Sequence, residues 1–218
     1  MNQVQPIEEE KRTDILKIIA IVAMLIDHVG YLLLPELTIL RVIGRIAFPI
    51  FAYHVVIGYK KTSDLKKYVY RLSIFAIISQ LPFAFFGGGL NIFFTLLMGI
   101  LAIYLFDKNK RNLLLILFIS IIAFEYFLIS FDYGLYGVMI ILLFFIYFND
   151  SRSLSLSFSL LTLLYCIEAN NYVQLFAIFA IPLFYLKYTT EVRLNKYFFY
   201  SFYPAHIALL LLINMIIH

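Results

Sequence analysis

The sequence predicts an all-α fold, a polytopic transmembrane helical bundle with about nine spans. Of its 218 residues, 63% are hydrophobic and only 14% are charged, and the mean hydropathy is +0.93. A soluble domain would carry about a quarter charged residues. Apolar runs recur from end to end between short polar joints, and about 20 apolar residues suffice for one helix to cross a bilayer. Lys and Arg gather in alternate joints, as the positive-inside rule predicts for a chain that crosses repeatedly.

Each predicted span is an apolar run that ends at charged or turn-forming residues. The first run follows the polar stretch MNQVQPIEEEKR without a cleavage motif, so we expect an uncleaved first span. The glycines at 87–89 predict an outer turn. The serine-biased stretch SRSLSLSFSLL predicts a Ser-lined helix rather than a strand, and the sixth to eighth runs are short enough to be tilted, interfacial or re-entrant. The nine predicted spans are Ile15–Leu34, Val42–Tyr59, Tyr68–Phe86, Leu90–Phe106, Leu113–Phe131, Leu135–Phe148, Leu154–Glu168, Tyr172–Leu186 and Tyr197–Ile217.

The basic residues predict the orientation of the bundle. With the N-terminus in the cytoplasm, fifteen of the seventeen Lys and Arg residues fall on inner segments, and the C-terminus falls outside. This use of positive charge argues against a nucleic-acid partner and for surrounding membrane lipid. No repeat, soluble domain or long linker interrupts the chain, so residues 1–218 are expected to form one domain in a cell membrane. Cys166 is the only cysteine, which excludes an internal disulfide, and no HExxH or CxxC spacing predicts a metal site.

Ionisable side chains inside the apolar runs are the candidate functional residues, because a charge within the hydrocarbon region costs several kcal/mol. His28 lies about 20 Å along the first span from Ile15. Lys17 precedes His28 by eleven residues, which is about three helical turns, so both should lie on one face about 16 Å apart. The extended pantetheine arm of coenzyme A has a comparable length. Phosphates held near Lys17 would therefore leave a thioester at His28.

Asp27 points about 100° away from His28 on the same helix. We therefore expect Asp27 to pair with Arg41 or Arg45 rather than to orient the imidazole, and a structural clamp between the first two spans is the simpler reading beside a catalytic role. Arg41 and Arg45 are the two basic residues that depart from the positive-inside rule. They lie on one helical face at the outer start of the second span. One interpretation is that they snorkel to the membrane surface or pair with an acidic residue. The other is that they form the wall of a functional site.

His206, in the last span, lies about 14 Å from the inner end of its helix and is a candidate for the same cavity as His28. His54, in the inner half of the second span, is predicted to be a packing residue. Asp132, in the turn FDYGLYG, is expected to face either the site or solvent.

Several blocks of sequence occur in an order that resembles the TraX family of membrane proteins. These blocks are LKIIAIVAMLIDHVGY, RVIGRIAFPIFAY, YVYRLSIFAIISQLPF, LNIFFTLLMGI, FDYGLYGV and KYFFYSFYPAHI, and the likeness covers roughly residues 14–212. The resemblance implies a relationship to type 3 acyltransferases and to heparan N-acetyltransferases. It implies acetyl-CoA as the acetyl donor and a bacterial pilin-like peptide or cell-surface glycan as the acceptor. A basic residue, ten residues and an essential histidine mark the first span of the type 3 family, and Lys17 and His28 match that spacing.

The roles that follow from this resemblance are expectations. His28 would act as general base on an amine or hydroxyl acceptor, or would carry the acetyl group itself. Asp27 and His206 complete the predicted catalytic set. Lys17, together with Arg41, Arg45 and Asn91, is predicted to bind acetyl-CoA, and Arg45 or Asn91 is expected to stabilise the oxyanion.

Two other functions fit the same residues. A small-molecule transporter would also place histidine, aspartate and arginine at mid-depth, although the chain shows no paired halves with matching broken helices. A non-catalytic assembly partner of a surface appendage is the second alternative, and it requires no catalytic pocket. Stabilisation of the protein by coenzyme A would count against this second alternative.

Overall fold

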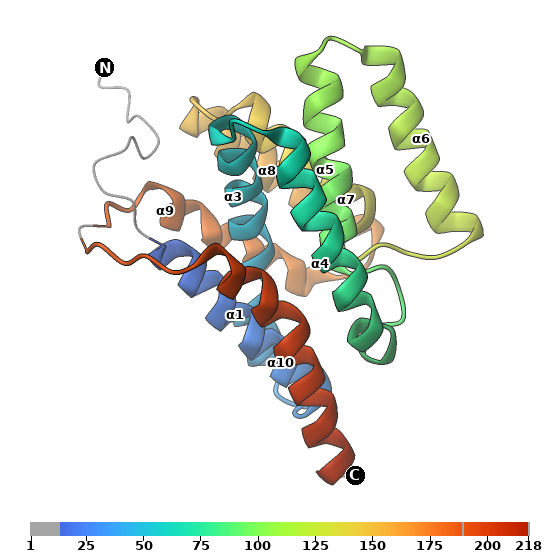
Figure 1. The fold of residues 1–218 in the computed structure, drawn as a ribbon, viewed down its shortest axis with the longest axis vertical. Coiled ribbons are helices and arrows are strands. Elements are labelled where there is room, and N and C mark those ends of the chain that lie inside the picture. Colours follow the sequence, from blue (N-terminus) through green and yellow to red (C-terminus); the bar gives the residue numbers. More distant parts are fainter. Residues whose placement is uncertain (1–13, 189, 218) are drawn as a thin grey trace.

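A computed structural model describes residues 14–188 and 190–217, and in this part of the chain the fold is all-α (Figure 1). The single bridge between Leu90 and Phe131 is the only β-type pairing among the described residues. The helices are α1 Ile15–Leu32, α2 Thr38–Gly44, α3 Ala47–Lys61, α4 Leu65–Phe86, α5 Ile92–Asp107, α6 Arg111–Phe127, α7 Gly134–Ile146, α8 Ser151–Glu168, the 3₁₀ helix η1 Tyr172–Phe179, α9 Ala180–Tyr185 and α10 Lys196–Ile217.

Each of the nine predicted spans falls on one of these helices or on a consecutive pair. The second predicted span is longer than expected, because α2 and α3 form one stretch with a break at Arg45 and Ile46. The eighth begins as the 3₁₀ helix η1 before it becomes α9. Within the described residues, four stretches are both long and apolar enough to cross a membrane: Ile15–Leu32, Thr38–Lys61, Leu65–Phe86 and Tyr197–Ile217. The passage of the other segments through the bilayer, and the orientation of the bundle, stay predictions.

Helices α1 and α10, from opposite ends of the sequence, lie side by side and run in the same direction (Figure 1). Near their N-terminal ends the Lys17 ammonium lies 5.1 Å from the centre of the Phe199 ring. Further along both helices, His28 contacts His206. Helix α4 packs against the other side of α10, and α3 packs against α1 and α7. The four helices α1, α3, α4 and α10 therefore surround the region where the polar side chains meet.

Helices α4 and α8 are each capped by a polar side chain at the N-terminal end. The carboxylate of Asp64 accepts a hydrogen bond from the Lys67 N–H at the start of α4, which holds the pKa of Asp64 below its usual value. Asp150 caps α8 in the same way through the N–H groups of Arg152 and Ser153. Both caps satisfy amides that lack partners inside the helix.

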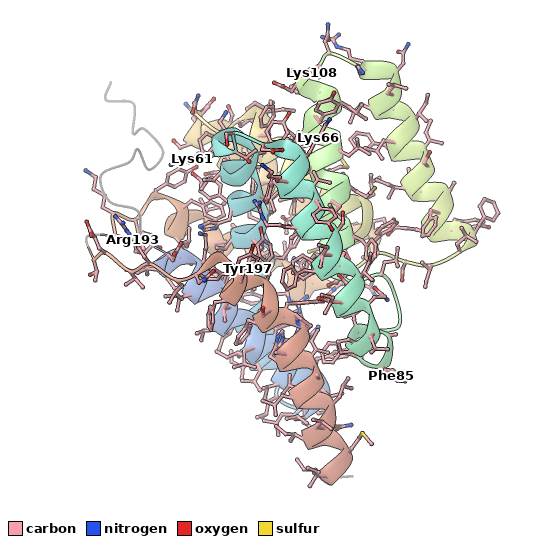
Figure 2. All side chains as sticks on the ribbon, in the orientation of Figure 1. Lys61, Lys66, Phe85, Lys108, Arg193 and Tyr197 are labelled. Atoms are coloured by element: carbon pink, nitrogen blue, oxygen red, sulfur yellow. The ribbon has the colours of Figure 1, made fainter. Side chains whose placement is uncertain are left out.

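The outer surface of the bundle carries large apolar side chains. On α4, Ile77, Leu81 and Phe85 are 69%, 72% and 77% exposed. A soluble protein rarely leaves so much apolar surface uncovered, whereas lipid contact makes it favourable. Lys61 and Lys66 lie at one end of the bundle with Lys108, and Phe85 lies toward the other end (Figure 2). These three lysines belong to segments predicted to face the cytoplasm, and the orientation itself stays a prediction.

Candidate functional site

The side chains of His28 on α1 and His206 on α10 are in direct contact. Nδ1 of His28 lies 2.7 Å from Nε2 of His206, and the two rings stack with an interplanar angle of 10°. His206 is buried at 4% exposure, and His28 is partly buried. The structure therefore brings the two histidines together, although His206 does not line the cavity that His28 lines.

The hydrogen-bond network determines which nitrogen of each ring carries a proton. Nδ1 of His206 lies 2.7 Å from the carbonyl oxygen of Phe202, which can only accept, so this nitrogen must donate. The Nε2 of neutral His206 is then an acceptor, and Nδ1 of His28 must donate to it. The Nε2 of His28 is left with a free lone pair. A chain from carbonyl to His206 to His28 thus prepares one imidazole nitrogen as a base or nucleophile.

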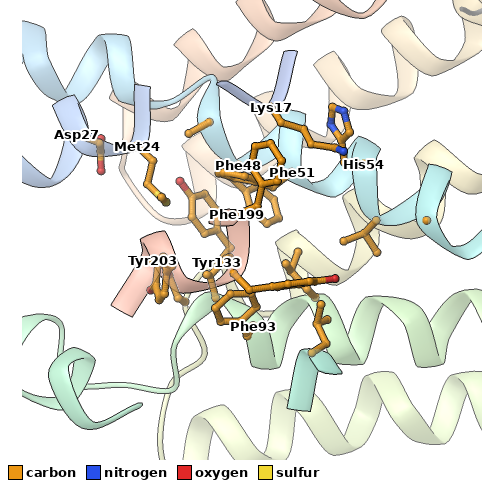
Figure 3. Close-up of a pocket in the computed structure, with 18 of the residues that line it drawn as sticks. Lys17, Met24, Asp27, Phe48, Phe51, His54, Phe93, Tyr133, Phe199 and Tyr203 are labelled. Carbon is orange, nitrogen blue, oxygen red and sulfur yellow. The ribbon is translucent and has the colours of Figure 1, made fainter. Parts of the chain in front are cut away.

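A cavity of about 250 Å³ extends along α1, and His28 is one of the residues that line it. Figure 3 shows most of the lining residues, with Lys17, Met24 and Asp27 of α1 labelled. Its lining includes Lys17, Met24 and His28, whose spacing of seven and four residues places them on one helical face. The predicted common face of Lys17 and His28 is therefore confirmed, and the cavity follows α1 for about 16 Å between them. Most of the other lining residues come from α3, α4, α5 and α10. Half of these are aromatic: Phe48, Phe51, Tyr68, Phe93, Phe199, Tyr200 and Tyr203.

At the Lys17 end of the cavity, the lysine is paired rather than isolated. Its Nζ lies 2.6 Å from Oδ1 of the buried Asp14, which precedes it by three residues. Asp14 also accepts a hydrogen bond from the Leu194 N–H. Sequence reasoning did not single out Asp14, although the i, i+3 spacing to Lys17 is a signal for such a pair.

His54 lies at the same end of the cavity, next to Lys17 (Figure 3). Its Nδ1 lies 2.9 Å from the carbonyl oxygen of Ile50 and must donate to it, so its Nε2 is available to another partner. The prediction of a simple packing residue was incomplete, because His54 also lines the cavity.

The carboxylate of Asp27 forms ion pairs with two arginines. Its Oδ2 lies 2.6 Å from Nη1 of Arg41, and its Oδ1 accepts a hydrogen bond from Nη2 of Arg45. Arg45 also donates to the side chain of Gln174, and Gly44 lies so close that an added Cβ would stand 2.1 Å from Cβ of Asp27. The expected pairing of Asp27 with these arginines is therefore confirmed. Asp27 itself lines the cavity, whereas Arg41 and Arg45 do not.

Asn91 does not line the cavity either. The side chain is fully buried and caps α5 by accepting from the Phe93 N–H, while its amide donates to the Ala76 carbonyl and to Gln80. These bonds occupy its polar atoms at the turn between α4 and α5. The geometry accounts for Asn91 as a helix cap, whereas the sequence had suggested a binding role.

Two residues of the turn before α7 complete the His28 end of the cavity. Asp132 lines it, as one of the two predicted placements allowed, together with Tyr133. Tyr133 adopts a left-handed backbone conformation with φ of 64°, unusual for a residue with a side chain, which starts α7 from this turn. The Asp132 main chain is fixed by the Thr95 hydroxyl and the Leu90 carbonyl. Tyr133 was missed because no local pattern in FDYGLYG shows which way its ring turns.

Comparisons with known proteins agree with the membrane-helical fold. The family profile described as "TraX protein" matches residues 12–214. A protein of Dichelobacter nodosus described as "Probable fimbrial assembly protein FimC, serogroup H1" is 28% identical over 230 residues, covering 89% of this chain and 92% of that protein. An uncharacterized protein of Rickettsia prowazekii is 46% identical over 68 residues, covering 31% of this chain and 25% of that protein. No solved structure matches the chain.

Proposed function

The chain belongs to the TraX family, and from this membership and the geometry of the site we propose that it is an acetyl-CoA-dependent transmembrane acetyltransferase. It would move an acetyl group from cytosolic acetyl-CoA to an amine or hydroxyl acceptor at the outer side of a bacterial cell membrane that it crosses several times. The single observation that carries the proposal is the cavity that joins Lys17 to His28. The same observation supports the relationship to type 3 acyltransferases, in which a basic residue and a histidine share this spacing.

The residues divide the reaction between the two ends of the cavity. Lys17, with His54 beside it, would bind phosphate groups of the donor, while the apolar aromatic wall would surround the pantetheine arm. At the other end, Nε2 of His28 would take a proton from the acceptor as the acceptor attacks the thioester carbonyl carbon. His206 would hold His28 in the required tautomer. Asp27 would act by fixing the first two helical segments to each other, since both of its oxygens are bound to arginine.

The acceptor is proposed from the comparisons. Because the Dichelobacter nodosus relative is described as a fimbrial assembly protein, a pilin-like peptide is the first candidate acceptor and a cell-surface glycan the second. That description also favours a second function, a non-catalytic partner in the assembly of a surface appendage. This alternative does not use the His28–His206 pair.

A direct experiment separates these functions. The purified protein in lipid nanodiscs is incubated with radiolabelled acetyl-CoA and a pilin-like peptide with a free N-terminal amine. We expect thermal stabilisation by coenzyme A and transfer of label to the peptide. Tight peptide binding without coenzyme A binding or transfer would favour the assembly partner. Uptake of a solute into vesicles without any dependence on coenzyme A would favour a transporter.

Replacing Lys17 with alanine is expected to raise the KM for acetyl-CoA about tenfold and to change kcat little. The reason is that one charge-assisted contact to phosphate contributes about 1.4 kcal/mol to binding, far from the reacting atoms. Steady-state kinetics measure both constants, and Lys17→Arg should retain most of the affinity. Because Lys17 also pairs with Asp14, Asp14→Asn is the control for simple disturbance of this end. An unchanged KM in folded Lys17→Ala would remove the lysine from donor binding.

A further inference from the structure

The Tyr203 hydroxyl is a buried polar group without a hydrogen-bond partner among the described residues. The side chain is only 3% exposed and lines the cavity. Its ring packs edge-on against His28 and His206, with ring centres 6.2 Å and 5.7 Å away, and against Phe93 at 5.3 Å. Buried hydroxyls are rarely left unpaired, so such a group at a cavity wall points to a ligand that supplies the missing partner.

A second donor belongs to a residue that lines the same cavity. Ile92 is the first residue of α5, where main-chain N–H groups have no partner inside the helix. The Asn91 cap takes the N–H of Phe93, and the Phe94 N–H bonds the Asn91 carbonyl. Ile92 lines the same cavity as Tyr203. The positive end of the α5 dipole adds to the attraction for negative charge at this point.

We propose that the Tyr203 hydroxyl and the Ile92 N–H form the oxyanion site of the reaction, which makes Tyr203 a further catalytic residue. This inference rests on the proposed acetyltransferase function. Preorganised donors of this kind stabilise the charge that develops on a carbonyl oxygen during acyl transfer. These two donors take over the oxyanion-stabilising role that the sequence had suggested for Arg45 or Asn91. In the structure Arg45 is paired with Asp27, and Asn91 caps α5.

The atoms balance in a single acyl transfer. The acceptor nitrogen or oxygen forms a bond to the thioester carbonyl carbon, and the carbonyl electron pair moves to its oxygen, where Tyr203 and Ile92 donate to it. His28 takes the proton that the acceptor loses. When the electron pair returns, the carbon–sulfur bond breaks, and coenzyme A leaves with the proton from His28. No oxidant, reductant or further reactant is required.

Tyr203→Phe tests the proposal because it removes one oxygen and keeps the ring that packs against Phe93 and the two histidines. The expected result is a decrease in kcat of about 10²-fold to 10³-fold with a change in the KM for acetyl-CoA of less than about threefold. Tyr165→Phe removes a half-buried hydroxyl outside the cavity and should leave kcat unchanged. A Tyr203→Phe protein that binds acetyl-CoA and turns over like wild type would overturn the assignment.

An independent readout does not depend on turnover. The probe is acetonyl-dethia-CoA, the analogue of acetyl-CoA in which a methylene group replaces the thioester sulfur. It carries a ¹³C-labelled carbonyl, and the infrared stretching band of the bound analogue is recorded. Hydrogen bonding to the carbonyl oxygen should lower the band frequency in wild type, and Tyr203→Phe should move it back toward the value in water-free solvent. Identical bands in both proteins would contradict the proposal. A wild-type protein that transfers no acetyl group would refute the proposed function. A wild-type protein that does transfer acetyl groups, with a Tyr203→Phe variant of equal activity, would refute only the proposed oxyanion site.

Discussion

His28→Asn is expected to lower kcat for acetyl transfer about 10³-fold while the protein folds and binds acetyl-CoA normally. The amide nitrogen of asparagine can occupy the position of the imidazole Nδ1 and can still donate to Nε2 of His206. What it lacks is the second ring nitrogen, whose free lone pair is the base. Positioned general bases contribute about 10²-fold to 10⁴-fold to rate. The measurement is coenzyme A release and label transfer by protein whose thermal unfolding matches wild type.

The contribution of His206 is separated by two substitutions. His206→Gln keeps an acceptor near the position of Nε2, whereas His206→Phe removes it and leaves the His28 tautomer undetermined. We expect the phenylalanine variant to lose much more activity than the glutamine variant. Nitrogen-15 NMR of labelled His28 should show a protonated Nδ1 in wild type and His206→Gln and a mixture in His206→Phe. Equal activity of all three proteins would show that the histidine contact is only packing.

Periodicity along single helices was enough to predict part of this site. The helical repeat predicted that Lys17 and His28 lie on one face of α1, and both line the cavity. The angular offset of Asp27 from His28 predicted its pairing with the arginines, which the structure confirms. Such arguments succeed because a helix has fixed geometry, so spacing in sequence becomes position in space. The apolar runs predicted the helices for the same reason.

The exact register of contacts between helices far apart in the sequence could not be predicted in this way. The His28–His206 bond joins residues 178 positions apart, and its register depends on how α1 and α10 pack. The burial of Asn91 depends on Gln80 and the Ala76 carbonyl, which only the turn between α4 and α5 brings to it. A polar residue in an apolar run therefore gave the same signal whether it served as a helix cap or lined the cavity.

Asp27→Ala is expected to destabilise the folded protein by about 3–5 kcal/mol. Removing this carboxylate leaves the Arg45 guanidinium, in a residue 8% exposed, without its charge partner and also frees Arg41. Breaking a buried ion pair by deleting one member carries a penalty of about this size, because the remaining charge stays desolvated. The free energy of unfolding can be measured by denaturant titration in detergent micelles.

Asp107→Ala provides the matched control for this prediction. Asp107 pairs with Lys108 at the surface, with Nζ and Oδ2 3.8 Å apart, and exposed pairs of this kind contribute about 0–1 kcal/mol. The double substitution Asp27→Ala with Arg45→Met should recover part of the lost stability, since it no longer buries an unpaired charge at position 45. If the clamp reading is right, kcat per folded Asp27→Ala molecule should fall far less than in His28→Asn. A fully stable Asp27→Ala protein that has lost all activity would instead return Asp27 to the catalytic set, with its carboxylate acting on the reacting groups rather than on the arginines.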